Sequence, residues 1–230
     1  MDILNIIKII TTIITGVIAL IIGLRVLFLN KNDLLNIWFS LYFISTSIGF
    51  IIYAIYHSIL NNAAIIIPLM ITAQIFFNFN TIAITMTLVV LEKHRKVSMS
   101  LKYLGTMLIV FFVMNIGYFV FPPHLEMSDY ALGIVNTHTD QALQIFVNAI
   151  RLLFATYATI RYNIITRKIE GETKNRTKNR MKWFSFGLII MILGLTTNLA
   201  GGLFSSILLE ILALVIIDIG AFLVLKGFLI

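Results

Sequence analysis

Three charged residues stand inside long runs of apolar residues. Arg151 lies in the stretch 141–162, and Glu210 and Asp218 lie in the stretch 206–229. A charge in such a run must be paired or solvated, so it usually faces the interior of a helix bundle or a water-filled cavity. Groups in that situation can bind the charge of a ligand, carry a proton or form an ion pair. These three residues are therefore the first candidates for chemistry.

Polar side chains, with small residues at two positions, recur at helical spacing in three of the apolar stretches. Steps of three and four residues place side chains on one face of a helix. The three lines are Tyr42, Thr46, Gly49, Tyr53 and His57; Gln74, Asn78, Thr81, Thr85 and Glu92; and Gln141, Gln144, Asn148, Arg151, Ala155 and Tyr162. Such lines either hold helices together through interhelical hydrogen bonds or border a polar cavity.

The sequence predicts one outward-facing polar pocket between these helices. Its lining residues would be Gln74, Asn78, Asn148, Arg151, Glu210 and His57. A helix rises about 1.5 Å per residue, which places Arg151 between Glu210 and Asp218 in height. We therefore predict that Arg151 pairs with one of these two acids. The network would either handle a ligand, ion or proton, or act as a structural lock.

The elements that must position these residues follow from the composition. The 230 residues are 60% hydrophobic and only 12% charged, with a mean hydropathy of +1.00. A soluble fold of this size cannot hide that much apolar surface. Seven stretches have about the 20 residues that cross a hydrocarbon core. They cover residues 3–29, 34–60, 63–91, 101–121, 141–162, 183–204 and 206–229.

These stretches predict an all-α, polytopic membrane protein in which a bundle of seven transmembrane helices forms one domain over residues 1–230. Only helices and closed barrels satisfy their backbone polar groups inside a bilayer. The stretches are too long and too evenly apolar for the alternating strands of a barrel. Small residues at helical spacing, such as Gly16 and Gly23 or Gly187 and Gly194, predict close contacts between helices.

The distribution of Lys and Arg predicts the orientation of the bundle. The loop after the third stretch contains Lys93, Arg95 and Lys96, and the loop after the fifth, TRKIEGETKNRTKNRMKW, is strongly basic. The loops after the second, fourth and sixth stretches contain no Lys or Arg. The positive-inside rule then places the N-terminus outside and the C-terminus in the cytoplasm of a multi-pass cell-membrane protein. The net charge of +7 is assigned to topology and to anionic lipids on the cytoplasmic face, not to nucleic acid.

The sequence lacks the motifs of several common reaction classes. The four histidines lack the spacing of metal ligands, and there is no cysteine, nucleophile elbow or glycine-rich phosphate loop. We therefore predict no enzyme, no metal and no cofactor. Asp218 is followed four residues later by Phe222. In microbial rhodopsins an Asp of the last helix is followed at that spacing by the retinal-binding Lys, so the chain resembles them in topology only and no retinal is expected.

A different resemblance rests on short segments. The third stretch ends in LVVLEKHRK, residues 88–96, and the sixth opens after a basic loop and contains Gly187 and Gly194. These segments resemble the seven-helix sensory membrane modules of prokaryotic histidine kinases and their stand-alone relatives. The resemblance implies a receptor-like protein that binds a small ligand in the outward pocket. We expect no kinase after Ile230, so the signal would pass through the basic cytoplasmic loops or a partner.

Two other classes stay open. The chain could be a small-solute or proton-coupled transporter that uses Asp218 and Arg151, or a structural membrane subunit. Flux that depends on Asp218 would indicate a transporter, whereas ligand binding without flux would indicate a receptor. A structural subunit would show neither.

Overall fold

The computed structural model describes residues 3–93, 95–168, 174–204 and 206–229, and nearly all of them lie in helices. The long helices are α1 (Ile3–Leu29), α2 (Leu34–Ser58), α3 (Ile66–Glu92), α5 (Thr106–Val120), α7 (Gln141–Lys168), α8 (Lys174–Leu203) and α9 (Ile207–Leu229). In the described part of the chain, seven helical segments are long and apolar enough to cross a membrane. The predicted all-α bundle with seven long apolar helices is confirmed at this level.

Shorter elements connect the long helices. They are the 3₁₀ turn η1 (Ala63–Ile65), α4 (Arg95–Ser98), the π-helical turn η2 (Leu101–Gly105), β1 (His124–Leu125), α6 (Met127–Ala131) and β2 (Thr137–His138). The two strands pair antiparallel, with His124 opposite His138 and Leu125 opposite Thr137. Between α6 and β2 the chain turns at Gly133, whose φ of 79° favours glycine.

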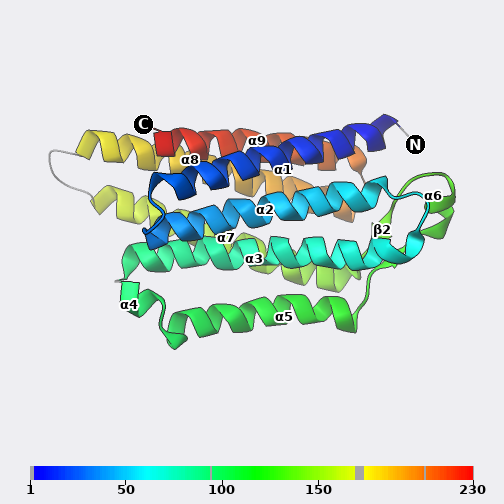
Figure 1. Cartoon of the computed structure of the whole chain (residues 1–230), viewed down its shortest axis with the longest axis horizontal. Coiled ribbons are helices and arrows are strands. Elements are labelled where there is room, and N and C mark those ends of the chain that lie inside the picture. Colours follow the sequence, from blue (N-terminus) through cyan, green and yellow to red (C-terminus); the bar gives the residue numbers. More distant parts are fainter. Residues whose placement is uncertain (1–2, 94, 169–173, 205, 230) are drawn as a thin grey trace.

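The long helices run side by side along the bundle (Figure 1). The contacts between them close six of the helices into a ring. Helix α1 packs on α2 and α9, α2 packs on α3, α3 on α7, α7 on α8, and α8 on α9. Helix α5 lies outside this ring, against α3 and α7. A space between the six ring helices is therefore reached by side chains from every one of them.

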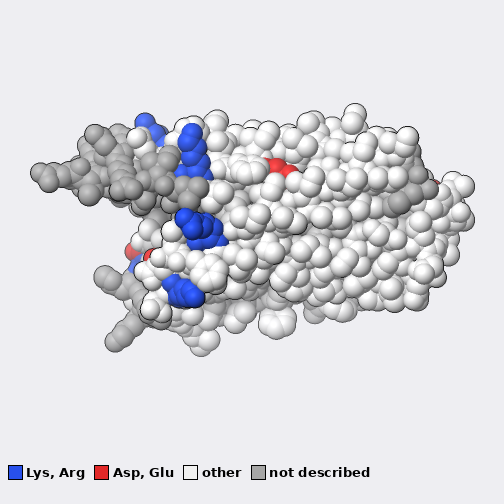
Figure 2. All heavy atoms as spheres, turned by 45° about the horizontal axis from the view of Figure 1, so that its top comes forward, with Lys and Arg blue, Asp and Glu red and all other residues white. Residues whose placement is uncertain are grey.

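The two ends of the bundle differ in character. One end, here called the hairpin end, carries α6 and the β1–β2 pair, and the N-terminus lies there (Figure 1). The opposite end, here called the basic end, holds the connection between α1 and α2, the short helix α4 after α3, the last residues of α7 and the first residues of α8. Figure 2 shows Lys and Arg gathered at the basic end of the face in view. Residues 94 and 169–173, which belong to the basic loops predicted to carry a signal, lie outside the described residues.

Two helices extend beyond the boundaries predicted for them. Helix α7 continues to Lys168, although the apolar stretch was predicted to end at residue 162, and α8 begins at Lys174, before the predicted residue 183. The prediction counted apolar residues, whereas Lys and Arg are good helix formers that continue a helix beyond its apolar part. Both helices therefore extend further toward the basic end than hydropathy indicates.

Close packing of α8 on α9 depends on small residues, as predicted. A Cβ atom on Gly187 would lie 2.6 Å from the carbonyl oxygen of Gly220. A Cβ atom on Gly194 would lie 2.6 Å from Cγ1 of Ile217 and 3.1 Å from the carbonyl oxygen of Ala213. Glycine at these positions lets the two backbones approach each other. This contact fixes α9, and with it Glu210 and Asp218, relative to α8.

The half of the bundle toward the basic end is filled by an apolar core. Its buried members are Ala19, Ile22, Val26, Phe39, Phe43, Ile84, Leu88, Ala158, Tyr162, Phe184, Leu188, Met191, Ile217, Ala221 and Val224. Aromatic rings meet edge to face there, with the centroids of Phe39 and Phe184 5.0 Å apart. Of the charged residues first singled out, Arg151 and Glu210 lie beyond this core, toward the hairpin end, whereas Asp218 lies between the core residues Ile217 and Ala221 of α9.

Candidate functional site

Two cavities follow one another along the inside of the helix ring. The one near the hairpin end, here called the hairpin cavity, has a volume of about 190 Å³, and the deeper one, here called the central cavity, about 150 Å³. The hairpin cavity is bordered by the segment 135–139 and by His57, Gln144 and Gly202. The central cavity extends toward the apolar core, down to Tyr42 and Thr159.

Seven residues line both cavities and form the boundary between them, here called the polar waist. They are Lys8, Tyr53, Gln74, Asn148, Arg151, Asn198 and Glu210. They come from α1, α2, α3, α7, α8 and α9, so each helix of the ring contributes at least one. The polar waist is therefore built by all six helices of the ring.

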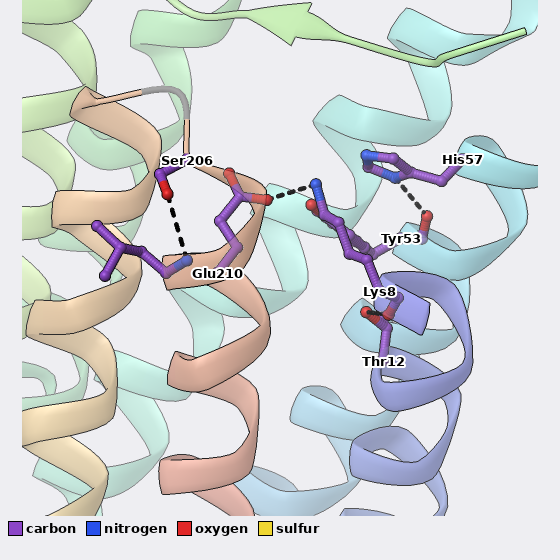
Figure 3. A network of polar contacts seen from close by, with 7 residues as sticks. Lys8, Thr12, Tyr53, His57, Ser206 and Glu210 are labelled. Carbon is purple, nitrogen blue, oxygen red and sulfur yellow. Dashed lines mark hydrogen bonds and ion pairs between the residues drawn. The ribbon is translucent and has the colours of Figure 1, made fainter. Parts of the chain in front are cut away.

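One side of the polar waist is an ion pair between the first and last helices. Nζ of Lys8 lies 2.5 Å from a carboxylate oxygen of Glu210, and these side chains are 10% and 20% exposed. Figure 3 shows them pointing toward each other from α1 and α9. Glu210 lies in the first turn of α9, where the helix dipole stabilises a negative charge. The ammonium group of Lys8 also lies 5.2 Å from the centroid of the Tyr53 ring.

His57 lies beside this ion pair in the wall of the hairpin cavity (Figure 3). Its Nδ1 is 2.9 Å from the carbonyl oxygen of Tyr53. Because a carbonyl oxygen only accepts, Nδ1 carries the proton and Nε2 is left for another partner. The ring stacks on Tyr53 with centroids 4.1 Å apart and is buried. His57 is therefore a buried and hydrogen-bonded part of the wall of the hairpin cavity.

The other side of the polar waist is Arg151, which is bound by neutral amide groups. Its Nε and Nη2 donate to Oδ1 of Asn78 at 3.0 and 2.6 Å. Nη2 also donates to Oε1 of Gln74 at 2.9 Å, and Nη1 donates weakly to Oδ1 of Asn148 at 3.4 Å. These oxygens orient the guanidinium group but do not cancel its charge.

Helix α5 supports this arrangement from outside the ring. Nδ2 of Asn78 donates to Oδ1 of Asn115 at 3.0 Å, and Nδ2 of Asn115 donates to the carbonyl oxygen of Phe111 at 2.7 Å. Both asparagines are buried. These bonds fix which way Asn78 faces, so that its Oδ1 points at Arg151. Asn78 itself lines neither cavity.

The predicted pairing of Arg151 with Glu210 or Asp218 is wrong. The ion pairs among the described residues are Lys8–Glu210 and Glu92–Arg161, and neither includes Arg151. The reason is the order of helices in the ring. Helix α7 packs on α3 and α8, whereas α9 packs on α1 and α8, so Lys8 is the cation nearest to Glu210.

Asp218 is held apart from both cavities. Its Oδ2 accepts a hydrogen bond from the hydroxyl of Thr15 at 3.1 Å, at the contact between α1 and α9. Its Oδ1 is buried and has no hydrogen-bond partner among the described residues. Asp218 lines neither cavity, so the structure separates it from Gln74, Asn148, Arg151 and Glu210, which meet at the polar waist.

Two residues of the site, Lys8 and Asn115, were not predicted, although the sequence contains a signal for Lys8. Asn5, Lys8, Thr12 and Thr15 step by three and four residues, which is the same one-face pattern as the three lines that were identified. All four are buried, which places this line on the inner face of α1. Asn115 and Tyr118 are three residues apart and share a face of α5, but a line of two residues was too short to indicate that Asn115 faces Asn78.

Some residues of the predicted polar lines form structural hydrogen bonds within or between helices. The hydroxyls of Thr46 and Thr85 donate to carbonyl oxygens four residues earlier in the same helix, at 2.8 and 2.7 Å. The hydroxyls of Tyr162 and Thr87 are 2.5 Å apart and join α7 to α3 below the central cavity. The lines therefore combine structural hydrogen bonds with cavity-lining groups.

Comparisons with known proteins leave the function to be argued from this geometry. A scan against models of known protein families finds no match, and a search of curated proteins finds none either. Within the described residues, no three His, Asp or Glu side chains lie together as a metal site would require. The arrangement offers one interior cation and one interior ion pair on the border of two cavities.

Proposed function

We propose that this chain is a receptor-like or sensory membrane protein of a prokaryotic cell. It spans the cell membrane seven times, with the hairpin end outside and the basic end in the cytoplasm. A small ligand enters from the hairpin end and binds at the polar waist. Helix lengths, apolar composition and the collection of Lys and Arg at one end support this orientation.

The observation that carries the proposal is the state of Arg151. Its guanidinium group is inside the bundle, lines two cavities and is bound by three amide side chains, while the acids of the described chain pair elsewhere or lie apart. A charge at this depth in a membrane is costly and usually has a functional reason. A structural lock would be expected to give Arg151 a carboxylate partner. A ligand-binding site would leave the guanidinium group of Arg151 without a carboxylate partner from the protein.

A signal would leave through the helices that the ligand contacts. Binding at the polar waist would change the hydrogen bonds of Arg151 or the Lys8–Glu210 ion pair, both of which join helices that are far apart in the chain. Helices α7 and α8 run from the waist to the basic end. A shift between them would move the basic segment that joins them, which would then act on a cytoplasmic partner or on anionic lipids.

A ligand screen tests this function. The thermal stability of the purified protein is measured across a panel of ions, metabolites and lipids, with Arg151→Gln in parallel. A compound that stabilises the parent and not the variant supports the site, since a ligand stabilises the state that binds it. If no compound shifts the parent and Arg151→Gln is merely less stable, Arg151 is a structural lock and the proposal is wrong.

The second candidate is a small-solute or proton-coupled carrier that uses Arg151 and Asp218. The observation in its favour is that two cavities follow one another along the inside of the ring and share a polar border, as the sites of a transport path would. Flux into vesicles that is lost in Asp218→Asn would favour the carrier. Because Asp218 lines neither cavity, a receptor predicts that Asp218→Asn binds the ligand as the parent does.

A further inference from the structure

We propose that the ligand is a small amphiphilic anion. Its carboxylate or phosphate group binds Arg151 at the polar waist, and its apolar part fills the central cavity. This inference rests on the proposed function and adds the chemical class of the ligand. It is argued from the balance of charge, from the free donors of Arg151 and from the lining of the central cavity.

The charge balance of the two cavities favours an anion. Among the described lining residues, the side chains that carry formal charge are Lys8, Arg151 and Glu210. Lys8 and Glu210 neutralise each other at 2.5 Å, which leaves the single positive charge of Arg151. A neutral ligand would leave that charge uncompensated in a medium of low dielectric constant, and a cation would add to it.

Arg151 also keeps donor capacity for such a group. A guanidinium group has five N–H donors in a fixed planar arrangement. The contacts of Nε and Nη2 with Asn78 and Gln74 are short, but the contact of Nη1 with Asn148 is 3.4 Å, long for an N–H···O hydrogen bond. Nη1 is therefore the atom best placed to donate to an anionic oxygen. Arginine prefers carboxylate and phosphate partners because its donors match their oxygens.

The central cavity sets the nature of the rest of the ligand. Below the polar waist its walls are formed mainly by apolar side chains, among them Phe50, Phe77, Leu188, Met191, Leu195 and Leu214. The volume of the whole cavity, about 150 Å³, is that of a cavity that holds a molecule of the size of benzene. A purely inorganic anion would leave this space empty. A ring or short alkyl chain attached to the anionic group would fill it and gain the free energy of apolar burial.

A matched series of probes tests the inference on the purified full-length chain. Benzoate carries the anion and the ring, benzamide replaces the anion with a neutral group of similar shape, benzylamine carries a cation, and acetate lacks the ring. Thermal stability against probe concentration gives an apparent affinity for each. We expect benzoate to bind at least about tenfold more tightly than benzamide or acetate, and benzylamine to show no stabilisation.

Three variants separate a specific effect from a loss of folding. Arg151→Gln should abolish the preference for benzoate over benzamide, whereas Arg151→Lys keeps the charge and should retain part of it. Arg161→Gln is the matched control, since Arg161 lies on the same helix and pairs with Glu92, 2.6 Å away, outside both cavities. Ala155→Phe, which fills the central cavity, should remove the advantage of benzoate over acetate.

The source of the anion is resolved by a lipid arm. The protein is compared in nanodiscs of phosphatidylcholine alone and of phosphatidylcholine with phosphatidylglycerol. Stabilisation by phosphatidylglycerol that needs Arg151 and removes the benzoate effect identifies a lipid headgroup, and an undiminished benzoate effect identifies a free anion. Both outcomes support an amphiphilic anion.

The contrary results are equally clear. Benzamide or benzylamine binding as well as benzoate, or a benzoate effect that survives in Arg151→Gln, would overturn the inference. If a neutral or cationic compound from the wider screen stabilises the parent through the polar waist, the proposed function stands and only the ligand class is wrong. If no compound of either set stabilises the parent, both fail together.

Discussion

Two arginines of helix α7, separated by about three helical turns, have opposite surroundings. Arg161, toward the basic end, donates through Nε to Glu92 at 2.7 Å and forms an ion pair with it. Arg151 lies among three amide side chains at the border of two cavities. Arg161 is the more exposed of the two and needs its carboxylate less, because water screens its charge. The charge that most needs an acid is the one without such a partner among the described residues.

The halves of the bundle around these arginines differ in the same way. At the level of Arg161 the apolar core fills the space between the ring helices. Around Arg151 the same helices leave cavities of about 150 and 190 Å³. Natural cores are packed to high density, and larger voids are few. The comparison indicates that the basic-end half is the more densely packed one, and the proposed function assigns the open hairpin-end half to ligand binding.

The largest expected effect comes from removing the interior charge. Arg151→Gln keeps an amide that can bond to Asn78 or Asn148 but loses the positive charge and the planar set of donors. We expect binding of an anionic ligand to weaken by about 2–5 kcal/mol, the usual cost of removing one partner of an interior charged contact. Isothermal titration with benzoate measures it. An unchanged affinity would mean that Arg151 does not contact the ligand.

An effect of similar size, on stability instead of binding, is expected at the ion pair that completes the polar waist. Glu210→Gln leaves Lys8 inside the bundle without its acid, and we expect it to lower the free energy of unfolding by about 3–5 kcal/mol. The double variant Lys8→Met, Glu210→Leu removes both charges and should recover most of that loss. Thermal unfolding in one detergent compares the two. A double variant no more stable than Glu210→Gln would show that Lys8 is not paired.

A smaller effect is expected at Asn115, which supports Asn78 from helix α5. Asn115→Leu removes the acceptor that fixes Asn78, and so loosens the amide that faces Arg151. One net hydrogen bond is worth about 1 kcal/mol, which corresponds to about a fivefold loss of affinity for benzoate. Titration of the variant checks this value. An effect on stability without any effect on affinity would limit Asn115 to a packing role.

The smallest effect is expected at the second arginine. Arg161→Gln should leave benzoate affinity unchanged and shift the unfolding temperature only slightly, because exposed ion pairs contribute little to stability. Raising the salt concentration should reduce even that shift. Measuring benzoate affinity in Arg161→Gln and Arg151→Gln side by side makes the comparison of the two arginines quantitative. Equal losses of affinity in the two variants would contradict the distinction between the two halves.

Spacing and hydropathy predicted much of this arrangement. The number of long apolar helices follows from stretch lengths, and the polar faces of α2, α3 and α7 follow from steps of three and four residues. These periods also singled out Gln74, Asn78, Asn148 and Arg151, which the structure brings together.

What spacing could not supply is the order of the helices in the ring. Periodicity says which face of a helix is polar but not which other helix that face meets. Arg151 was expected to pair with Glu210 or Asp218, but Glu210 pairs with Lys8 because α9 closes the ring against α1. The same lack of information hid Asn115, whose helix lies outside the ring yet orients Asn78. Height along the bundle was not sufficient, because a pair also requires neighbouring helices.

The most direct test uses the absence of cysteine from the sequence. Asn198, which lines both cavities, is changed to Cys as the single thiol, and anionic and cationic methanethiosulfonate reagents are applied from the hairpin side. The account predicts that the anionic reagent reacts faster, and that Arg151→Gln, but not Arg161→Gln, removes this preference. Equal rates for the two reagents, or a preference that does not depend on Arg151, would contradict the claim that Arg151 presents an open positive charge to an accessible cavity.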